Sequence, residues 1–277
     1  MIKGIDISRY QGNPDFRRVK AAGIHYVMLK ATEGVNYIDP CFKANAAAAT
    51  AAGMPIGVYH FLRAGSVADQ VRDCLATIKP YKITWPVAVD VEHAELLALG
   101  REKLTDMVLD FCARIKAAGY QPMVYSNYNW MYVAKYLDIA RIKAAGIPIW
   151  MAWYNSATPD NTDRSNLCDM WQYASDGKVD GITSDGLDMD VSYPDFGALK
   201  YTIDTTTDVE IAPGDCYTAK TTGDIQLVAG TPRVVQIIRC IQQGYILWHI
   251  VPIGKPGQDV GIYPQGSNTR LFKVKIK

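Results

Sequence analysis

RIKAAGYQPMVY, residues 114–125, joins the end of an expected helix to the start of an expected strand through one glycine. Glycine is favoured just after a helix because it adopts left-handed backbone angles without a steric cost. The phrase recurs as RVKAAGIHYVML at 18–29, as RIKAAGIPIWMA at 141–152 and, more loosely, as TAAGMPIGVYHF at 50–61. Repeated helix-to-strand units favour a parallel sheet or barrel covered by helices.

Eight apolar runs have the character of strands. They are IKGIDIS, YVMLKAT, IGVYHF, PVAVDVE, PMVYSN, PIWMAWY, DMWQYA and GLDMDVSY. Helices are expected in the first five connections, near 14–22, 40–52, 66–79, 101–118 and 129–145. The sixth connection is polar and the seventh is short and rich in glycine, so neither is expected to form a covering helix. The pattern predicts an α/β fold, an incomplete (β/α)5(β)3 TIM-like barrel.

The composition changes near residue 201, where short β-rich runs alternate with Gly, Pro, Asp and Thr. This predicts a small all-β, sandwich-like module. We therefore expect two domains, a barrel over 1–200 and the module over 201–277, with DTTTD at 204–208 as the linker. In the module, Tyr245, Trp248 and Tyr263 form either a binding patch or, the better interpretation, part of its core.

The bulk composition excludes several classes of partner. The net charge of +1 gives no electrostatic attraction to nucleic acid or to an anionic membrane. No apolar stretch approaches the ~18 residues of a membrane-spanning helix. The N-terminal MIKGIDISRYQ has no apolar segment typical of a signal peptide. The six cysteines form no CxxC pair, which favours buried free thiols over disulfides or a zinc site. Nothing indicates the oligomeric state.

The ends of the expected strands carry polar and aromatic side chains, and in parallel β-α folds these ends share one mouth. VAVDVEH, residues 87–93, places Asp90 and Glu92 on one face if the whole run is a strand. Carboxylates among aromatic rings suit sugar chemistry, because rings stack on sugars while one acid protonates a glycosidic oxygen and an ionised neighbour stabilises positive charge. The acids at strand ends are Asp6, Asp90, Glu92 and Asp188. The other candidates are Lys30, Glu33, Tyr59, Phe61, Tyr125, Trp150, Trp153 and Gln172.

Each of these residues also has a structural interpretation. A lone aspartate at a strand end more often caps a helix or a turn. Tyr125 and Trp150 fit an ordinary core, and Lys30 with Glu33 fits an ion pair. His60 and His93 are more often structural than catalytic. The functional interpretation depends on the whole set occurring in order.

The motifs GIDISRYQG, LKATEG, GVYHF, DVE, YSN, W-x-A-x-Y, WQY and LDMD occur in order within 4–190. As a set they resemble the glycoside hydrolase family 25 lysozymes, which are muramidases of bacteria and phages. The resemblance covers about residues 1–200 and implies a (β/α)5(β)3 barrel. The module after it is similar to small Ig-like modules of bacterial wall enzymes, for which wall binding, spacing and dimerisation are all open.

The resemblance implies cleavage of the β-1,4 bond between N-acetylmuramic acid and N-acetylglucosamine in peptidoglycan. Glu92 matches the family's catalytic acid, and Asp90, Asp6 and Asp188 match its other acids. Asp190 stands where the family commonly has Asn; it shares a face with Asp188, and we prefer Asp188 by its motif position. Retention of configuration is expected, with either the substrate's acetamido oxygen or Asp90 attacking the anomeric carbon. No cofactor or metal is expected.

Two alternatives belong to other classes. One is a metal-dependent deacetylase of a cell-wall sugar, with Asp6, Asp90, His60 and His93 as ligands, although no HxxxH or HExxH pair occurs. The other is a glycan-binding barrel without activity. On the main interpretation the protein acts on the extracellular cell wall, after release as a phage lysin or as a secreted form that has lost its signal.

Overall fold

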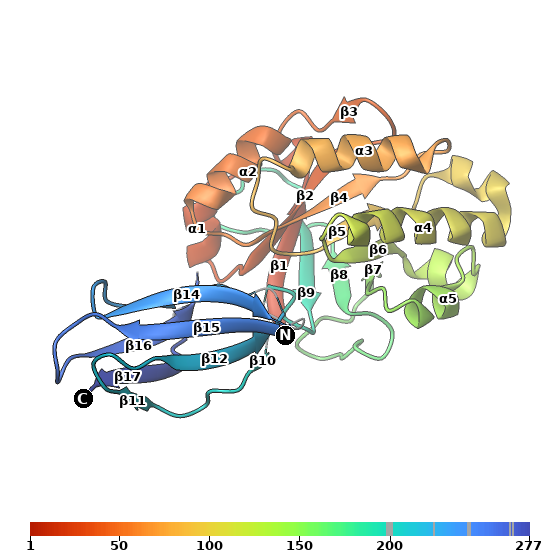
Figure 1. The fold of residues 1–277 in the computed structure, drawn as a ribbon. Helices are drawn as coiled ribbons and strands as arrows, with labels where there is room; N and C mark the ends of the chain where they lie inside the picture. Colours follow the sequence, from red (N-terminus) through yellow and green to blue (C-terminus); the bar gives the residue numbers. More distant parts are fainter. Residues whose placement is uncertain (198–201, 224, 243–244, 266, 268) are drawn as a thin grey trace. The chain divides into compact units, whose positions relative to one another are not determined.

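The computed structural model describes residues 1–197, 202–223, 225–242, 245–265, 267 and 269–277. The chain divides into two compact units, residues 1–197 and 198–277. Each unit has its own hydrophobic core and is described by itself (Figure 1).

Eight strands of the first unit close into a barrel. They are β1 (Ile2–Ile7), β2 (Tyr26–Glu33), β4 (Ile56–Phe61), β5 (Val87–Asp90), β6 (Pro122–Asn127), β7 (Ile149–Ala152), β8 (Met170–Ala174) and β9 (Asp188–Ser192). Their order is β1-β9-β8-β7-β6-β5-β4-β2, and the pairing of β1 with β2 completes the ring. A short β3 (Tyr37–Ile38) pairs with the end of β2. The predicted barrel is confirmed.

The direction of the last strand differs from the expectation. Seven strands run parallel, whereas β9 runs antiparallel to both β8 and β1. A parallel strand needs a crossover that returns the chain to the far end of the sheet, usually through a helix. The glycine-containing turns of residues 175–187 form no helix and lead directly into β9. The start of β9 therefore lies at the mouth of the barrel. The prediction that the end of this strand lies there is wrong.

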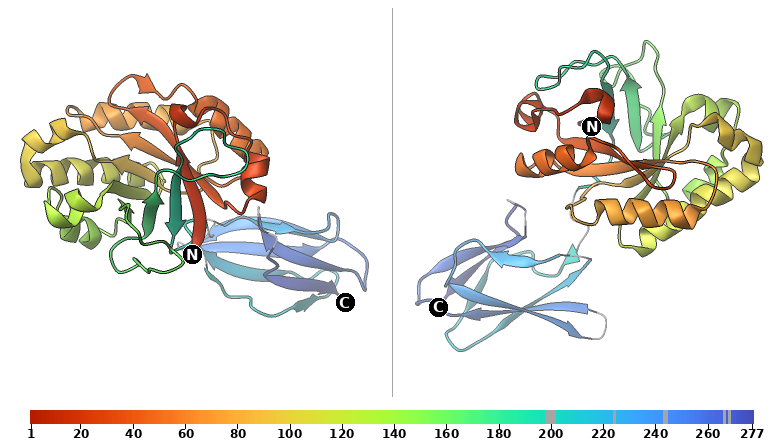
Figure 2. Two further views of the ribbon diagram at one scale, coloured as in Figure 1. Left: turned by 180° about the vertical axis from the view of Figure 1, so that it is seen from behind. Right: turned by 90° about the horizontal axis from the view of Figure 1, so that it is seen from above.

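The helices lie outside the barrel strands (Figures 1 and 2). They are α1 (Phe16–Ala21), α2 (Phe42–Ala51), α3 (Val67–Ile78), α4 (Gly100–Ala117) and α5 (Ile139–Ala144), with short 3-10 turns at Arg9–Gln11 and Ala94–Leu99. The helix expected over 129–145 is broken into a π-helical turn, Asn129–Val133, and α5. Lys135 has a positive φ of 55° between them, which a helix does not accommodate. None of the helices in the described part of the chain has the length and apolar character needed to cross a bilayer.

The glycines of the repeated phrase act as the sequence predicts. Gly119, after α4, has a φ of 89°, and Gly146, after α5, has a φ of 70°. Inside the barrel, two other glycines are required for packing. A Cβ on Gly4 would lie 2.1 Å from the Tyr26 ring, and one on Gly57 would lie 2.3 Å from the Met28 sulfur. Large side chains thus fill the barrel beneath its mouth.

The second unit consists of two four-stranded sheets. One contains β10 (Thr202–Ile203), β12 (Tyr217–Thr222), β15 (Tyr245–Pro252) and β14 (Val235–Gln242). The other contains β11 (Val209–Ile211), β17 (Phe272–Ile276), β16 (Asp259–Pro264) and β13 (Leu227–Ala229). Side chains of both sheets share one buried cluster, so the sheets pack face to face as a small sandwich. Trp248 is fully buried in it and donates to the Thr221 hydroxyl at 2.7 Å, so it belongs to the core.

The expected linker lies inside this module. Residues 204–208 connect β10 to β11, and Thr205 is buried with its hydroxyl 2.9 Å from that of Tyr217. The prediction of a linker at DTTTD is therefore wrong, because a threonine-rich stretch looks alike in a linker and in a loop of a sandwich. The six cysteines are free. Burial raises the pKa of the Cys74, Cys112 and Cys168 thiols to about 12.

Candidate active site

A pocket of about 460 Å³ opens where β2, β4 and β5 end and β9 begins. Its lining is Ser8, Arg9, Tyr10, Gln11, Lys30, Glu33, Tyr37, Asp39, Tyr59, Phe61, Arg63, Asp90, Glu92, His93 and Asp188. Seven of the residues singled out from the sequence are in this set: Lys30, Glu33, Tyr59, Phe61, Asp90, Glu92 and Asp188. The others, Asp6, Tyr125, Trp150, Trp153 and Gln172, do not line it.

Asp90 and Glu92 lie in different local structures. Strand β5 ends at Asp90, so the alternation of a strand does not extend to Glu92. The Val91 amide still donates to the Tyr125 carbonyl at 2.9 Å, which holds the intervening residue against β6. Asp90 is 4% exposed, and its Oδ1 is buried without a hydrogen-bond partner. Glu92 is exposed to solvent, so it is the acid of this pair that a bound molecule can reach.

The pKa values of both acids are raised, by different neighbours. Loss of hydration against the pocket wall raises the pKa of Glu92, and the charge of Asp188 raises it further. Burial raises the pKa of Asp90, and the charge of Glu92 adds to this. The Lys30 ammonium opposes both effects. The arrangement favours a proton on the pair, as a general acid requires.

The aspartates of β1 and β9 lie at two depths. Asp6 is paired with Asp188 in the ladder, and Gly4 is paired with Asp190. Asp188 is partly buried and lines the pocket, whereas Asp190 is fully buried and accepts a hydrogen bond from Trp150 Nε1 at 2.8 Å. Burial raises the pKa of Asp188 to about 6. Of the two acids on β9, it is therefore Asp188 that faces the pocket.

Gln172 on β8 orients Asp6. Its side-chain amide donates to Asp6 Oδ2 at 2.6 Å, and its carbonyl accepts from the Tyr125 hydroxyl at 2.9 Å and from Tyr154. Burial and the nearby charges of Asp190 and Asp188 raise the pKa of Asp6. Tyr125 and Gln172 thus act beneath the pocket as supports. Tyr154 was not among the sequence candidates, although it is the last residue of the W-x-A-x-Y motif.

A chain of ion pairs borders the pocket. Lys30 Nζ lies 2.8 Å from Glu33 Oε2, Arg63 Nη1 lies 3.0 Å from Glu33 Oε1, and Arg63 Nε lies 2.8 Å from Glu95 Oε1. The Lys30 ammonium also lies 4.6 Å from the centre of the Phe61 ring. Sequence analysis missed Arg63 and Glu95, because the loop after β4 and the 3-10 turn after β5 carry no distinguishing pattern.

The two tryptophans have structural surroundings. The Trp153 ring stacks on Tyr128 with centroids 3.7 Å apart, and the Arg164 guanidinium lies 3.6 Å from its centre. Two groups this close must cover opposite faces of the ring, so Trp153 has no free face for a sugar. Trp150 is 1% exposed and packs inside the barrel, with the Tyr125 centroid 4.6 Å away. The expected sugar contacts are therefore not supported for either tryptophan.

His60 is not at the mouth. It alternates with the pocket residues Tyr59 and Phe61 along β4 and stacks on Phe111 of α4. Its Nε2 donates to Gln70 Oε1 at 3.0 Å, and its Nδ1 lies 2.7 Å from the Thr32 hydroxyl. The set of metal ligands considered for a deacetylase is therefore not brought together. Among the described residues, no group of three or more His, Cys, Asp or Glu is arranged to hold a metal.

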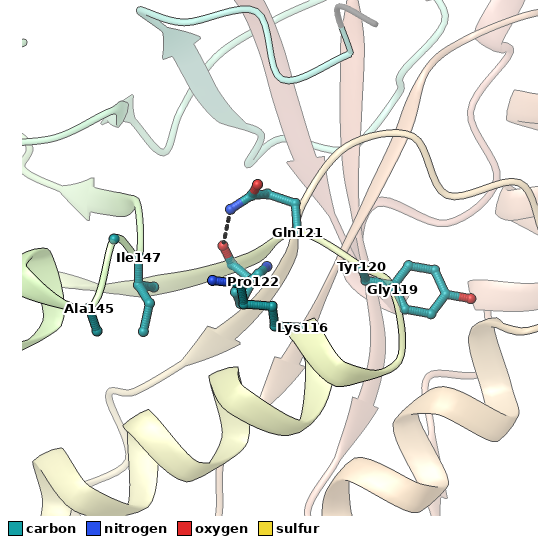
Figure 3. Close-up of a pocket in the computed structure, with 8 residues that line it drawn as sticks. Lys116, Gly119, Tyr120, Gln121, Pro122, Ala145 and Ile147 are labelled. Carbon is teal, nitrogen blue, oxygen red and sulfur yellow. Dashed lines mark hydrogen bonds between the residues drawn. The ribbon is translucent and has the colours of Figure 1, made fainter. Parts of the chain in front are cut away.

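A second pocket, of about 380 Å³, lies at the opposite end of the strands (Figure 3). It is bordered by the residues that precede β6 and β7, and Gln121 there donates to the Pro122 carbonyl at 3.2 Å. Its lining contains Lys116 but no carboxylate. This pocket therefore offers no acid for hydrolysis.

The fold and the pocket define a (β/α)-type barrel whose acids gather where strands meet at one mouth, an arrangement found in glycoside hydrolases. The chain belongs to the glycosyl hydrolases family 25, whose family model matches residues 5–182.

Curated relatives include the autolytic lysozyme of Clostridium acetobutylicum, which is 34% identical over 184 residues, or 66% of this chain and 53% of that protein. Lysozyme M1 of Streptomyces globisporus is 31% identical over 194 residues, or 66% of this chain and 65% of that protein. The chain thus spans between about half and two thirds of these relatives. Among solved structures, the bacterial lysozyme from Streptomyces coelicolor matches with a TM-score of 0.59 and 29% identity, over 70% of this chain and 92% of that chain.

Proposed function

We propose that the chain hydrolyses the β-1,4 bond between N-acetylmuramic acid and N-acetylglucosamine in bacterial peptidoglycan, acting on the extracellular cell wall. The observation that carries this proposal is the pairing of an accessible Glu92 with a buried Asp90 in one pocket. Membership of the glycosyl hydrolases family 25 supports the same reaction class.

Glu92 is the general acid in this mechanism. Its raised pKa lets it hold a proton to a higher pH than an ordinary glutamate, and its exposure lets it approach the glycosidic oxygen. When it gives up this proton, the bond to the leaving sugar breaks and positive charge develops at the anomeric carbon. Asp188 raises the pKa of Glu92, and Lys30 limits the rise.

Asp90 steers the substrate in this proposal, and the acetamido oxygen of the muramic residue attacks the anomeric carbon. A nucleophile must come within bonding reach of that carbon, but Asp90 is only 4% exposed. Asp90 Oδ1 has no hydrogen-bond partner, so after a small rearrangement of the side chain it can accept a hydrogen bond from the acetamido N–H. This bond would orient the acetamido carbonyl oxygen toward the anomeric carbon. Hydrolysis of the resulting cyclic intermediate by water gives net retention.

The test is mass spectrometry of fragments released from defined peptidoglycan. We expect muramic acid at each new reducing end. Glu92→Gln should lower the rate by about a thousandfold or more while leaving the far-UV circular dichroism unchanged, because the amide cannot donate the proton. Glu102→Gln is the matched control, since Glu102 is an exposed glutamate on α4.

Four outcomes would contradict the proposal. Glucosamine at the new reducing ends would indicate a glucosaminidase. Near-normal activity of Glu92→Gln would remove its role as the acid. A wild-type chain that binds peptidoglycan but releases no reducing ends would be a binding barrel, and activity that disappears with EDTA would indicate metal-dependent chemistry.

A further inference from the structure

The backbone of Arg9 is fixed at the edge of the pocket. Arg9 begins the 3-10 turn that follows β1, and Ser8 and Gln11 close this turn with reciprocal side-chain hydrogen bonds. The Arg9 amide donates to Asp39 Oδ2 at 3.1 Å, and Asp39 is 2% exposed. A buried carboxylate therefore holds this residue in place through its main chain, which leaves its side chain free for another purpose.

The guanidinium of Arg9 is held by two phenols. Its Nη1 donates to the Tyr37 hydroxyl at 3.2 Å, and its Nη2 donates to the Tyr10 hydroxyl at 3.0 Å. Its carbon also lies 4.9 Å from the centre of the Tyr10 ring, which is 73% exposed. A guanidinium has five N–H donors, so donors remain for a ligand after both tyrosines are satisfied.

The other cationic groups of the pocket already face carboxylates. Lys30 pairs with Glu33, and Arg63 pairs with both Glu33 and Glu95. Within the described residues, no carboxylate pairs with the Arg9 guanidinium. Arg9 is thus an oriented cation without a counter-ion, and an oriented guanidinium is suited to binding a carboxylate through two hydrogen bonds.

The charge of the pocket explains why such a cation would matter. Five carboxyl groups line the pocket, those of Glu33, Asp39, Asp90, Glu92 and Asp188. An anionic substrate would be repelled by them unless a positive group received its charge. In peptidoglycan the peptide stem, with its free carboxylates, is joined to the lactyl group of the muramic acid whose bond is cleaved.

We propose that Arg9, held by Tyr10 and Tyr37, binds a carboxylate of the peptide stem and makes the chain select stem-bearing glycan. This inference rests on the proposed function. The phosphates of wall polymers offer similar chemistry, but a stem on the muramic residue is the anion joined directly to the sugar at the cleaved bond. Arg9 is then a residue that sets specificity, and the acids of the pocket carry out the reaction.

The test compares full-length wild type and Arg9→Ala on three substrates. They are intact walls, walls stripped of phosphate polymers with acid, and glycan strands stripped of stems by an amidase. The measured quantity is the selectivity, defined as the ratio of kcat/KM on a stem-bearing substrate to kcat/KM on strands stripped of stems. We expect Arg9→Ala to lower this ratio about five- to tenfold for both kinds of wall, because a charge-assisted hydrogen bond is lost.

Two further variants refine the test. Arg9→Lys keeps the charge but not the two-armed contact, so it should recover part of the selectivity. Arg17→Ala removes another exposed arginine, on α1 and outside the pocket, and should leave the ratio at its wild-type value.

Contrary outcomes separate this inference from the proposed function. An unchanged ratio in Arg9→Ala, or an equal fall in Arg17→Ala, would overturn the role of Arg9. If the fall in selectivity of Arg9→Ala disappears after the phosphate polymers are removed, Arg9 binds their phosphates. That result would overturn the proposed contact with a stem carboxylate. If the wild type cleaves none of the three substrates, it is the proposed function that fails.

Discussion

Asp6 on β1 and Asp188 on β9 are direct partners across the seam at which the first and last barrel strands pair. Because β9 runs antiparallel to β1, a residue that begins one strand lies beside a residue near the end of the other. The seam therefore brings together acids that are 182 positions apart in the chain. Burial raises the pKa of Glu92, and the charge of Asp188 raises it further, so the seam contributes to the tuning of the proposed acid.

Replacing Asp188 should move the pH profile of hydrolysis. Asp188→Asn removes the negative charge that raises the pKa of Glu92, so this pKa falls. A general acid loses activity as the pH rises through its pKa, and the alkaline limb of kcat/KM should therefore shift to lower pH. The pKa of Asp188 is about 6, so the profiles should differ most above that pH, where the wild-type residue is charged.

The measurement is kcat/KM on soluble glycan from pH 4 to 9. Asp185→Asn is the control, because Asp185 is exposed in the turn before β9 and does not line the pocket. An alkaline limb that stays in place in Asp188→Asn would show that Asp188 does not tune Glu92.

Replacing the buried Asp190 should stabilise the barrel at high pH. Burial and the charge of Asp188 raise the pKa of Asp190 in the folded state above its ordinary value. The folded state therefore binds more protons than the unfolded state, and stability is lost as the pH rises through the folded pKa. Asn cannot ionise, yet its side-chain oxygen can still accept from Trp150 Nε1.

We expect Asp190→Asn to raise the free energy of unfolding by about 1–3 kcal/mol at pH 8 relative to wild type. The advantage should disappear below pH 4, where the wild-type carboxyl is protonated in both states. Urea unfolding followed by tryptophan fluorescence measures it. An advantage of equal size at both pH values would mean that ionisation is not its cause.

His60 should make the barrel sensitive to acid. Burial lowers the pKa of His60 to about 4, below the ~6.5 of a free imidazole. The stability contributed by the neutral ring is present above pH 6.5 and is lost as the pH falls toward 4, because the unfolded chain takes up the proton first. The difference between these pKa values corresponds to about 3 kcal/mol at most.

His60→Gln isolates this contribution. At pH 7.5 the variant should be less stable than wild type, since it loses the contact with Phe111. By pH 4.5 the difference in the free energy of unfolding should narrow. Proton uptake by His60 in the unfolded chain lowers the stability of the wild type, whereas the variant has no such group. If the difference in the free energy of unfolding does not depend on pH, the titration of His60 is not the source of the acid sensitivity.

Trp153 should affect stability far more than substrate binding. Its ring lies between Tyr128 and Arg164, and Trp153→Ala leaves a cavity there. We expect a loss of about 3 kcal/mol in the free energy of unfolding. The KM for soluble glycan, measured well below the melting temperature, should change less than in Phe61→Ala, because Phe61 lines the pocket. A larger rise in KM for Trp153→Ala than for Phe61→Ala would show that Trp153 contacts the sugar after all.

Much of the fold could be predicted because local patterns determine it. Gly119 and Gly146 mark the ends of helices by backbone angles that few other residues adopt. The apolar runs mark strands, and their polar ends locate the mouth. The same patterns predicted that Asp90, Glu92 and Asp188 would share a mouth, because all three were placed at strand ends, although Asp188 begins β9.

The rest depends on contacts between distant segments. An apolar run has no direction, so nothing in residues 187–192 distinguishes an antiparallel β9 from a parallel one. The Trp153 ring is covered by Tyr128, at the start of the π-helical turn, and by Arg164, in the loop before β8. A tryptophan near a strand end looks alike in the sequence whether its face is free or covered. Arg63 joins Glu33 to Glu95 across three segments, and no spacing within one segment indicates this.

The closure of the barrel has a consequence for the timing of synthesis. The ribosome makes β1 first, but its partner β9 begins only at Asp188, and the two together supply acids to a single mouth. While the chain emerges, β1 can pair with β2, yet its other edge stays without a partner until nearly all of the barrel has been made. A nascent chain therefore carries Glu92 long before Asp188 exists to raise its pKa, and the acids of the pocket are complete only once β9 has been made.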